Sequence, residues 1–249
     1  MIRVNIRTLV DSIRSDGAVI AGTHRDQLSL AVPSCPDWTV RDLIIHVGVV
    51  HRWAARFLAQ GSDPAERFGF DTSDVPDDAG LTEWYAARVA ELLERLEVTS
   101  PDTTVRSFAG QVSASFWFRR QAHETSMHRW DLQNATPQGA EPVDGGLAAD
   151  GINEWLEVFV PRFLKRGPGL PDQEFGRVIR LVDPDVGEWT MRLEPDAVKI
   201  DAGAHPEVVV SGSMSDLLLA LWRRIPLSQL SIEGNRAPLD ALLDAVRVT

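Results

Sequence analysis

The sequence contains a single cysteine, Cys35, among 249 residues. An intrachain disulfide is therefore impossible, and zinc sites built on two or more thiolates are excluded. Long apolar runs are also missing. The sequence has no run of eighteen consecutive apolar residues, and its first seven residues lack the apolar segment of a secretory signal. These absences predict a cytoplasmic protein with no membrane-spanning helix.

Positive charge is scarce, with 25 Lys and Arg residues against 36 Asp and Glu and a formal net charge of −11. Sequence-independent binding of nucleic acid needs basic side chains that displace phosphate counterions, and anionic lipid attracts basic segments in the same way. We therefore expect no nucleic-acid partner and no membrane partner. The 44% of hydrophobic residues is ordinary for a globular protein with a core.

Several well-known catalytic signatures are absent. The chain has no glycine-rich dinucleotide or phosphate-binding loop, no Gly-x-Ser-x-Gly and no His-Glu-x-x-His. His123, Glu124 and His128 miss the last motif by one residue, and two histidines five positions apart do not share a helix face. The signatures of nucleotide-binding, acyl-transfer and zincin enzymes are thus excluded.

Apolar residues in the first 135 positions follow the period of amphipathic helices. Thr39, after the breaks at Pro33 and Pro36, can cap the second helix with its side-chain oxygen. A polar segment with two prolines reads as a long loop before the third helix. No strand signal intervenes, so we predict a four-helix bundle with helices near 6–28, 39–60, 81–96 and 113–134 and a loop at 61–80.

The hydrophobic period changes after a Pro- and Gly-rich linker at 137–146. A helical segment follows, in which Pro161 is expected to end or kink the helix. Alternating segments then predict short strands, with helices at 147–164, 213–222 and 238–246 and strands near 177–182, 189–193, 197–200 and 207–211. The predicted fold class is α+β in two domains, a four-helix bundle at 1–136 and an α+β domain at 145–249.

Glu124 and His128 are the first candidates for chemistry. They are four residues apart, so their side chains lie on one helix face and can converge on a single metal ion. The pattern is weak alone, because helices contain such pairs by chance. Trp117 lies on the same stripe and favours an inward face, while a neighbouring apolar strip leaves the orientation open.

His46 lies in an apolar stripe of the second helix, where a lone histidine is more often a packed core residue than a ligand. Asp131 follows His128 by three residues and can orient its imidazole as an outer hydrogen-bond acceptor. The alternative is an exposed acid beside Arg129. From these patterns alone, His46 and Asp131 are each compatible with a functional role and with a structural role.

The remaining thiol and imidazoles are weaker candidates. His24 falls on the inward stripe of the first helix and is expected to be packed. His51 and His123 are expected to be structural or solvated, and no neighbour in the sequence marks Cys35 as an activated nucleophile.

Three segments carry a resemblance to a known family. They are Cys35-Pro-Asp-Trp-Thr-Val-Arg-Asp-Leu-Ile-Ile-His46, His123-Glu-Thr-Ser-Met-His-Arg-Trp-Asp131, and the stretch from Val210 to Arg224. In this order they resemble the mycothiol-dependent maleylpyruvate isomerase family. The resemblance implies a DinB-like four-helix bundle and a sterol-carrier-like α+β domain, in agreement with the change of period.

Carried onto this sequence, the resemblance implies that His46, Glu124 and His128 bind a divalent metal, usually zinc. Two imidazoles and a carboxylate leave a coordination position open, as catalytic zinc sites do. It also implies that an arginine of the second domain assists catalysis. Arg224 is the nearest match, and Arg223 is its rival because relatives often have a smaller residue in the middle of Trp-Arg-Arg.

We therefore expect a metal-dependent enzyme with mycothiol as thiol cosubstrate and a small electrophile as substrate. S-transfer to the electrophile ranks first, and cis–trans isomerisation of the maleylpyruvate type ranks second. Two further alternatives are a non-catalytic, metal-stabilised protein that binds a small ligand and a metal hydrolase that needs no thiol. The oligomeric state stays open between a monomer and a weak dimer.

Overall fold

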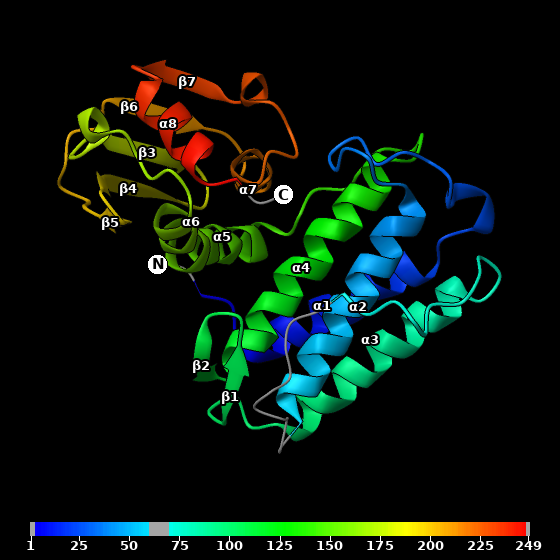
Figure 1. The fold of residues 1–249 in the computed structure, drawn as a ribbon. Coiled ribbons are helices and arrows are strands. Elements are labelled where there is room, and N and C mark those ends of the chain that lie inside the picture. Colours follow the sequence, from blue (N-terminus) through cyan, green and yellow to red (C-terminus); the bar gives the residue numbers. More distant parts are fainter. Residues whose placement is uncertain (1–2, 60–69, 248–249) are drawn as a thin grey trace. The chain divides into compact units, whose positions relative to one another are not determined.

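The computed structural model describes residues 3–59 and 70–247 and divides the chain into two compact units (Figure 1). One unit comprises Val4–Glu141, and the other comprises residues 142–249 together with Arg3. The division lies within the predicted linker at 137–146. Among the described residues, no helix combines the length and the apolar character needed to cross a membrane.

Four long helices form the first unit: α1 (Ile6–Ala21), α2 (Val40–Leu58), α3 (Leu81–Val98) and α4 (Ser115–Asn134). Helix α1 packs against α3 and α4, and α2 packs against the same two helices from the other side of the bundle (Figure 1). The predicted fold class, a helical N-terminal region followed by an α+β region, is confirmed.

Helix α2, which carries His46, begins where the sequence predicts. The Thr39 side chain accepts a hydrogen bond from the Asp42 backbone N–H, and the Asp42 carboxylate accepts one from the Thr39 backbone N–H. This reciprocal cap satisfies two donors that a helix start leaves open. Leu43 and Val47 on the inner stripe are fully buried, which fixes the rotation of the helix and hence the direction of His46.

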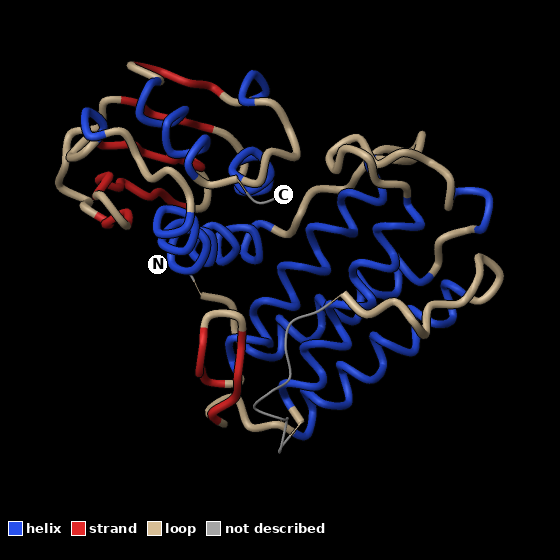
Figure 2. Tube along the Cα trace, viewed as in Figure 1, coloured by secondary structure: helices blue, strands red, loops and turns tan. Residues whose placement is uncertain are grey.

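The expectation of helices alone in the first unit is wrong, because a β-hairpin separates α3 from α4. Strands β1 (Thr104–Ser107) and β2 (Gly110–Ser113) pair antiparallel, as Figure 2 shows in red beside the blue helices. Each strand has four residues, too few for alternation to be recognised. Gly110 adopts a φ of 104°, which glycine tolerates and the turn requires.

The first helix is shorter than predicted. It ends at Ala21, with Gly22 as its C-cap, and His24 is exposed in the following turn. The expectation that the first helix reaches residue 28 and packs His24 is therefore wrong. Leu28 is nonetheless buried, so an inward apolar residue seven positions beyond the end of the helix extended the apparent period.

The predicted loop at 61–80 and the predicted end of the second helix at residue 60 fall partly outside the described residues. In the described part, α2 ends at Leu58 and residues 70–80 contain only turns and irregular backbone before α3. Phe70, the first described residue after the gap, contacts the side chain of His46.

The second unit begins with a continuous helical stretch in three parts: α5 (Gly145–Glu154), a wide turn at Trp155–Phe159, and α6 (Val160–Arg166). Pro161 lies in the first turn of α6, directly after the wide turn, and it has no N–H to donate to a carbonyl of the preceding turn. The wide turn makes hydrogen bonds of the π type, a form usually found as a single turn within helices. Pro161 therefore interrupts the regular α-helix without ending the helical stretch.

A five-stranded sheet completes the second unit. Its strands are β3 (Val178–Asp183), β4 (Gly187–Glu194), β5 (Ala197–Ile200), β6 (Val208–Ser211) and β7 (Ser231–Gly234), accompanied by the helices α7 (Met214–Leu221) and α8 (Ala237–Ala245). The strand order in the sheet is β5-β4-β3-β6-β7, and of its neighbouring pairs only β3 and β6 run parallel. The sequence did not predict β7, whose four residues include one large apolar side chain, Ile232.

Candidate metal centre

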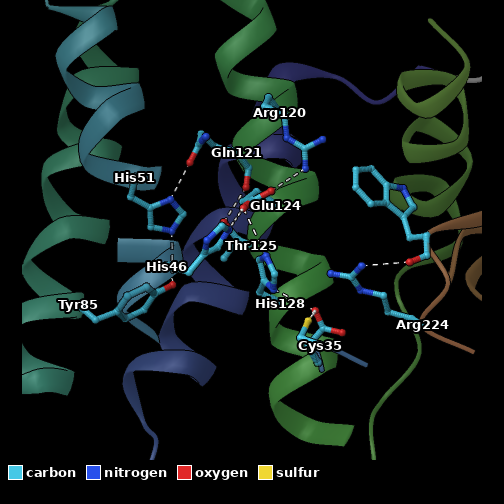
Figure 3. Close-up of polar contacts among 12 residues, drawn as sticks. Cys35, His46, His51, Tyr85, Arg120, Gln121, Glu124, Thr125, His128 and Arg224 are labelled. Carbon is cyan, nitrogen blue, oxygen red and sulfur yellow. Dashed lines mark hydrogen bonds and ion pairs between the residues drawn. The ribbon is translucent and has the colours of Figure 1, made fainter. Parts of the chain in front are cut away.

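Helices α2 and α4 bring three predicted ligands together in the first unit (Figure 3). The Glu124 Oε1 atom lies 3.1 Å from His46 Nε2 and 3.4 Å from His128 Nε2. One donor atom from each residue lies within 4.8 Å of the others. The structure thus places a histidine of one helix against a Glu-x-x-x-His pair of another.

The donor set fits a small divalent cation. Zinc binds imidazole nitrogen and carboxylate oxygen at about 2.0–2.2 Å in tetrahedral geometry, which separates neighbouring ligand atoms by about 3.3 Å. The separations of 3.1 and 3.4 Å between Glu124 Oε1 and the two imidazole nitrogens match that value. Three protein ligands leave a fourth position for a substrate atom, the pattern of catalytic zinc sites.

Glu124 is held as a carboxylate by its neighbours. Burial alone raises the pKa of this carboxyl, but hydrogen bonds with His128 and His46, and the charges of His128 and Arg120, bring it well below its ordinary value. A metal ligand has to be deprotonated before it can bind. Glu124 therefore meets this requirement across the whole physiological pH range.

His128 is oriented by Asp131 on the same helix. Its Nδ1 lies 3.0 Å from Asp131 Oδ2, while its Nε2 faces Glu124. Burial lowers the pKa of His128, but the contacts with Asp131 and Glu124 raise it to about 9. Asp131 is fully buried and also accepts a hydrogen bond of 2.5 Å from Ser34 Oγ. An outer carboxylate in this position fixes an imidazole so that its Nε2 is the nitrogen offered to a metal.

A second group of possible ligands shares His128. Cys35 Sγ lies 3.7 Å from Asp131 Oδ2, and among the described residues Cys35, His128 and Asp131 form the other cluster with metal-ligating atoms in mutual reach. Both Asp131 oxygens already have partners, Ser34 on one and His128 on the other. The resemblance to the family implies the cluster of His46, Glu124 and His128, which is therefore the candidate centre.

Aromatic side chains surround the imidazoles. The Trp38 ring lies 4.7 Å from the His46 ring and 6.0 Å from that of His128, measured between centroids. Phe70 stacks on His46 at 5.3 Å. An apolar surrounding of this kind restricts the approach of water and strengthens electrostatic interactions at a site.

A buried polar chain next to the site was not predicted from the sequence. His51 is fully buried, and its Nδ1 lies 2.7 Å from Gln121 Oε1 and its Nε2 3.4 Å from the Tyr85 hydroxyl. Burial raises the pKa of Tyr85, so its hydroxyl keeps the proton and donates to His51 Nε2. His51 is therefore a neutral imidazole that donates through Nδ1 to Gln121.

The free energy of unfolding is expected to depend on pH through His51. Burial lowers the pKa of its imidazole from 6.5 to about 4, despite the bond with Gln121 and the charge of Glu124, which raise it. Because the unfolded chain then binds the proton more readily, stability falls between pH 6.5 and pH 4 and is unaffected above that range. A shift of this size corresponds to about 3 kcal/mol.

Denaturant unfolding of the wild type and of His51→Gln, measured from pH 8 to pH 4, checks this prediction. The advantage of the wild type over the variant is expected to shrink as the pH is lowered through this range. Two pH profiles that run parallel would mean that His51 has the same pKa in the folded and in the unfolded protein, and would contradict its burial as a neutral imidazole.

The arginine predicted to assist catalysis belongs to the second unit. Arg224 follows α7, and its Nη1 donates to the Trp222 carbonyl at 3.0 Å. Its rival, Arg223, donates to the Leu243 carbonyl and to Asp244 Oδ1 at the end of α8. Both arginines therefore have hydrogen-bond partners within the second unit.

Two domain families match the chain. Residues 12–133 match the family described as the mycothiol maleylpyruvate isomerase N-terminal domain. Residues 146–241 match the corresponding C-terminal domain. The first match contains all three clustered side chains, and the second contains both arginines.

Solved structures of similar fold carry the same description. A crystal structure of mycothiol-dependent maleylpyruvate isomerase has a TM-score of 0.60 at 18% identity and covers 88% of this chain and 90% of its own. A histidine-to-alanine mutant of that enzyme has a TM-score of 0.61 at 16% identity, covering 92% and 93%. Identities this low establish the fold alone.

Closer relatives occur in Mycobacterium tuberculosis. Uncharacterized proteins of the strains CDC 1551 / Oshkosh and ATCC 25618 / H37Rv are each 29% identical to this chain over 157 residues. Each alignment covers 62% of this chain and 78% of the relative.

Proposed function

This chain belongs to the mycothiol maleylpyruvate isomerase family, and from that membership we propose that it is a metal-dependent enzyme that uses mycothiol as its thiol cosubstrate. The observation that carries the proposal is the approach of Glu124 Oε1 to both imidazole nitrogens, at 3.1 and 3.4 Å. Family membership supports the thiol, and the donor set supports the metal.

His46, Glu124 and His128 would hold the metal, and zinc suits two imidazoles and a carboxylate. A divalent cation there supplies the positive charge that lets a thiol lose its proton at neutral pH. Asp131 keeps the Nδ1 side of His128 occupied, so that its Nε2 faces the other ligands. Arg224 is proposed to bind a carboxylate of the substrate, for which the forked guanidinium is well suited.

Isomerisation and S-transfer share their first step, the addition of the thiolate to an electrophilic carbon. In isomerisation the thiolate adds to a conjugated double bond, the former double bond rotates, and the thiolate leaves again. In S-transfer the sulfur stays on the carbon as a thioether, and either the neighbouring carbon takes up a proton or a leaving group such as chloride departs. The names of the two solved structures support isomerisation as the first choice for this chain. S-transfer, which the sequence ranked first, becomes the second.

A free thiol as cosubstrate favours a reducing compartment, so the proposal places the enzyme in the cytoplasm.

Turnover of two electrophiles tests the proposal. The zinc-loaded protein is mixed with a cis-configured conjugated keto diacid or with a chloro-dinitroarene, each with and without mycothiol, and the products are analysed by mass spectrometry. An isomerase is expected to give a product of unchanged mass from the diacid and to regenerate the thiol. A transferase is expected to give a thioether from either electrophile. The diacid gains the mass of one thiol molecule, whereas the chloro-dinitroarene gives the thiol-substituted arene and releases chloride and a proton.

The controls separate the alternatives. His46→Ala is expected to lose turnover while keeping its far-ultraviolet circular dichroism. Turnover without added thiol would instead identify a hydrolase. Absence of turnover under every condition, together with unfolding of the wild type on chelation, would identify a protein that uses the metal for stability alone.

A further inference from the structure

The two oxygens of Glu124 have different partners. Oε1 faces His46 Nε2 and His128 Nε2, whereas Oε2 accepts a hydrogen bond from Arg120 Nη2 at 3.1 Å. Arg120 lies one helical turn before Glu124 on α4, and 5% of its side chain is exposed (Figure 3). The carboxylate is thus divided between a guanidinium on one side and the imidazoles on the other.

We infer that Arg120 is a positioning residue that restricts Glu124 to a single metal-binding oxygen and so keeps a coordination position open for the thiol. The inference rests on the proposed function, since it concerns the same metal. A charge-assisted hydrogen bond from a buried guanidinium is strong and directional. With Oε2 held in this way, only Oε1 is available to the cation.

The number of bound oxygens matters for the chemistry. Carboxylates bind metals through one oxygen or through two. Two bound oxygens of Glu124, together with two imidazole nitrogens, would fill the four positions that zinc prefers, and a thiol would have to displace one of them. One bound oxygen leaves the fourth position to the thiol.

Charge balance supports the same role. Arg120 offsets part of the negative charge of Glu124 through its buried ion pair with Oε2. The positive charge of a bound cation is then not cancelled by its ligand carboxylate. More of it remains to stabilise a thiolate, which is itself an anion.

Cobalt(II) substitution tests the inference, because its visible spectrum reports the number of ligands and does not depend on turnover. The proteins compared are the wild type, Arg120→Gln and Arg120→Lys, each loaded with cobalt and titrated with mycothiol. In Arg120→Gln we expect cobalt to be retained, its absorption to weaken as the coordination number rises, and the affinity for the thiol to fall by about tenfold. Arg120→Lys keeps a cationic donor, so its spectrum is expected to stay close to that of the wild type.

Arg129 provides a matched control on the same helix. It is as buried as Arg120, but it forms an ion pair with Asp16 and hydrogen bonds with Gln133 and the Glu141 carbonyl. Arg129→Gln is expected to lower the melting temperature without altering the cobalt spectrum or the thiol affinity. This comparison separates the loss of a buried arginine from a change at the metal.

The possible outcomes are distinguishable. If the wild type takes up no cobalt, the proposed metal centre fails and the inference fails with it. If the wild type gives a four-coordinate spectrum and Arg120→Gln gives the same spectrum and thiol affinity, only the role of Arg120 is overturned. Arg120→Met repeats the measurement, with the same two outcomes, should circular dichroism show that the glutamine variant does not fold.

Discussion

Alanine at position 46, 124 or 128 is expected to lower the affinity for zinc by more than about 100-fold and to abolish thiol-dependent turnover. Changes to outer groups that only orient ligands already weaken metal binding by about 10–100-fold. Removing His46, Glu124 or His128 takes away one of three ligands and leaves a site that cannot hold the cation against a chelator. The measurement is zinc content after dialysis, followed by competition with a chromophoric chelator.

Cys35→Ser is the control for these three variants. It changes the cluster that shares His128 but leaves all three proposed ligands, His46, Glu124 and His128, in place. We expect it to keep the zinc affinity of the wild type. If Cys35→Ser loses zinc while His46→Ala retains it, the metal belongs to Cys35, His128 and Asp131, and the centre described here is wrong. Zinc at wild-type occupancy in all variants would remove both sites.

Asp131→Asn is expected to weaken zinc binding by about 10–100-fold while leaving all three ligands present. Asp131 Oδ2 lies 3.0 Å from His128 Nδ1 and keeps a proton on that nitrogen, so that Nε2, which faces Glu124, is the nitrogen that would bind the cation after losing its proton. An amide can offer an N–H group to Nδ1 instead, which favours the tautomer that cannot bind metal through Nε2.

Ser34→Ala is the matched variant for this prediction. Ser34 donates to the other oxygen of Asp131 at 2.5 Å, so its loss loosens the carboxylate without altering its charge. A smaller decrease in zinc affinity than for Asp131→Asn is expected. Equal affinities for the wild type and Asp131→Asn, with both proteins folded by circular dichroism, would contradict an orienting role for Asp131.

Local patterns in the sequence predicted the half of the centre that lies on one helix. Glu124 and His128 are four residues apart, and Asp131 is three further on, so helical geometry alone places them together. His46 lies 78 residues from Glu124, and its pattern is that of a packed histidine. Only the resemblance to the family joined it to the others, because periodicity describes one helix face and not which faces meet.

Contacts that depend on the tertiary fold were beyond the reach of the sequence. Ser34 and Cys35 approach Asp131 across 97 and 96 residues of chain, and no local spacing signals that approach. The hydrogen bond of Arg120 to Glu124 lies at the spacing of an ordinary helical ion pair, which usually faces water. Its burial gives it a role, and burial follows from how the helices pack.

His46 and Glu124 are far apart in the sequence and meet only in the folded protein, so a bound metal would stabilise the fold. The supply of metal would therefore affect the amount of protein in the cell. In the unfolded chain only Glu124 and His128 stay near each other, so a cation gains its third ligand when α2 and α4 assemble. A cation that prefers the folded form adds about 4 kcal/mol to stability at a thousandfold excess over its dissociation constant. Cells starved of the metal would then lose the protein to proteolysis as well as losing its activity.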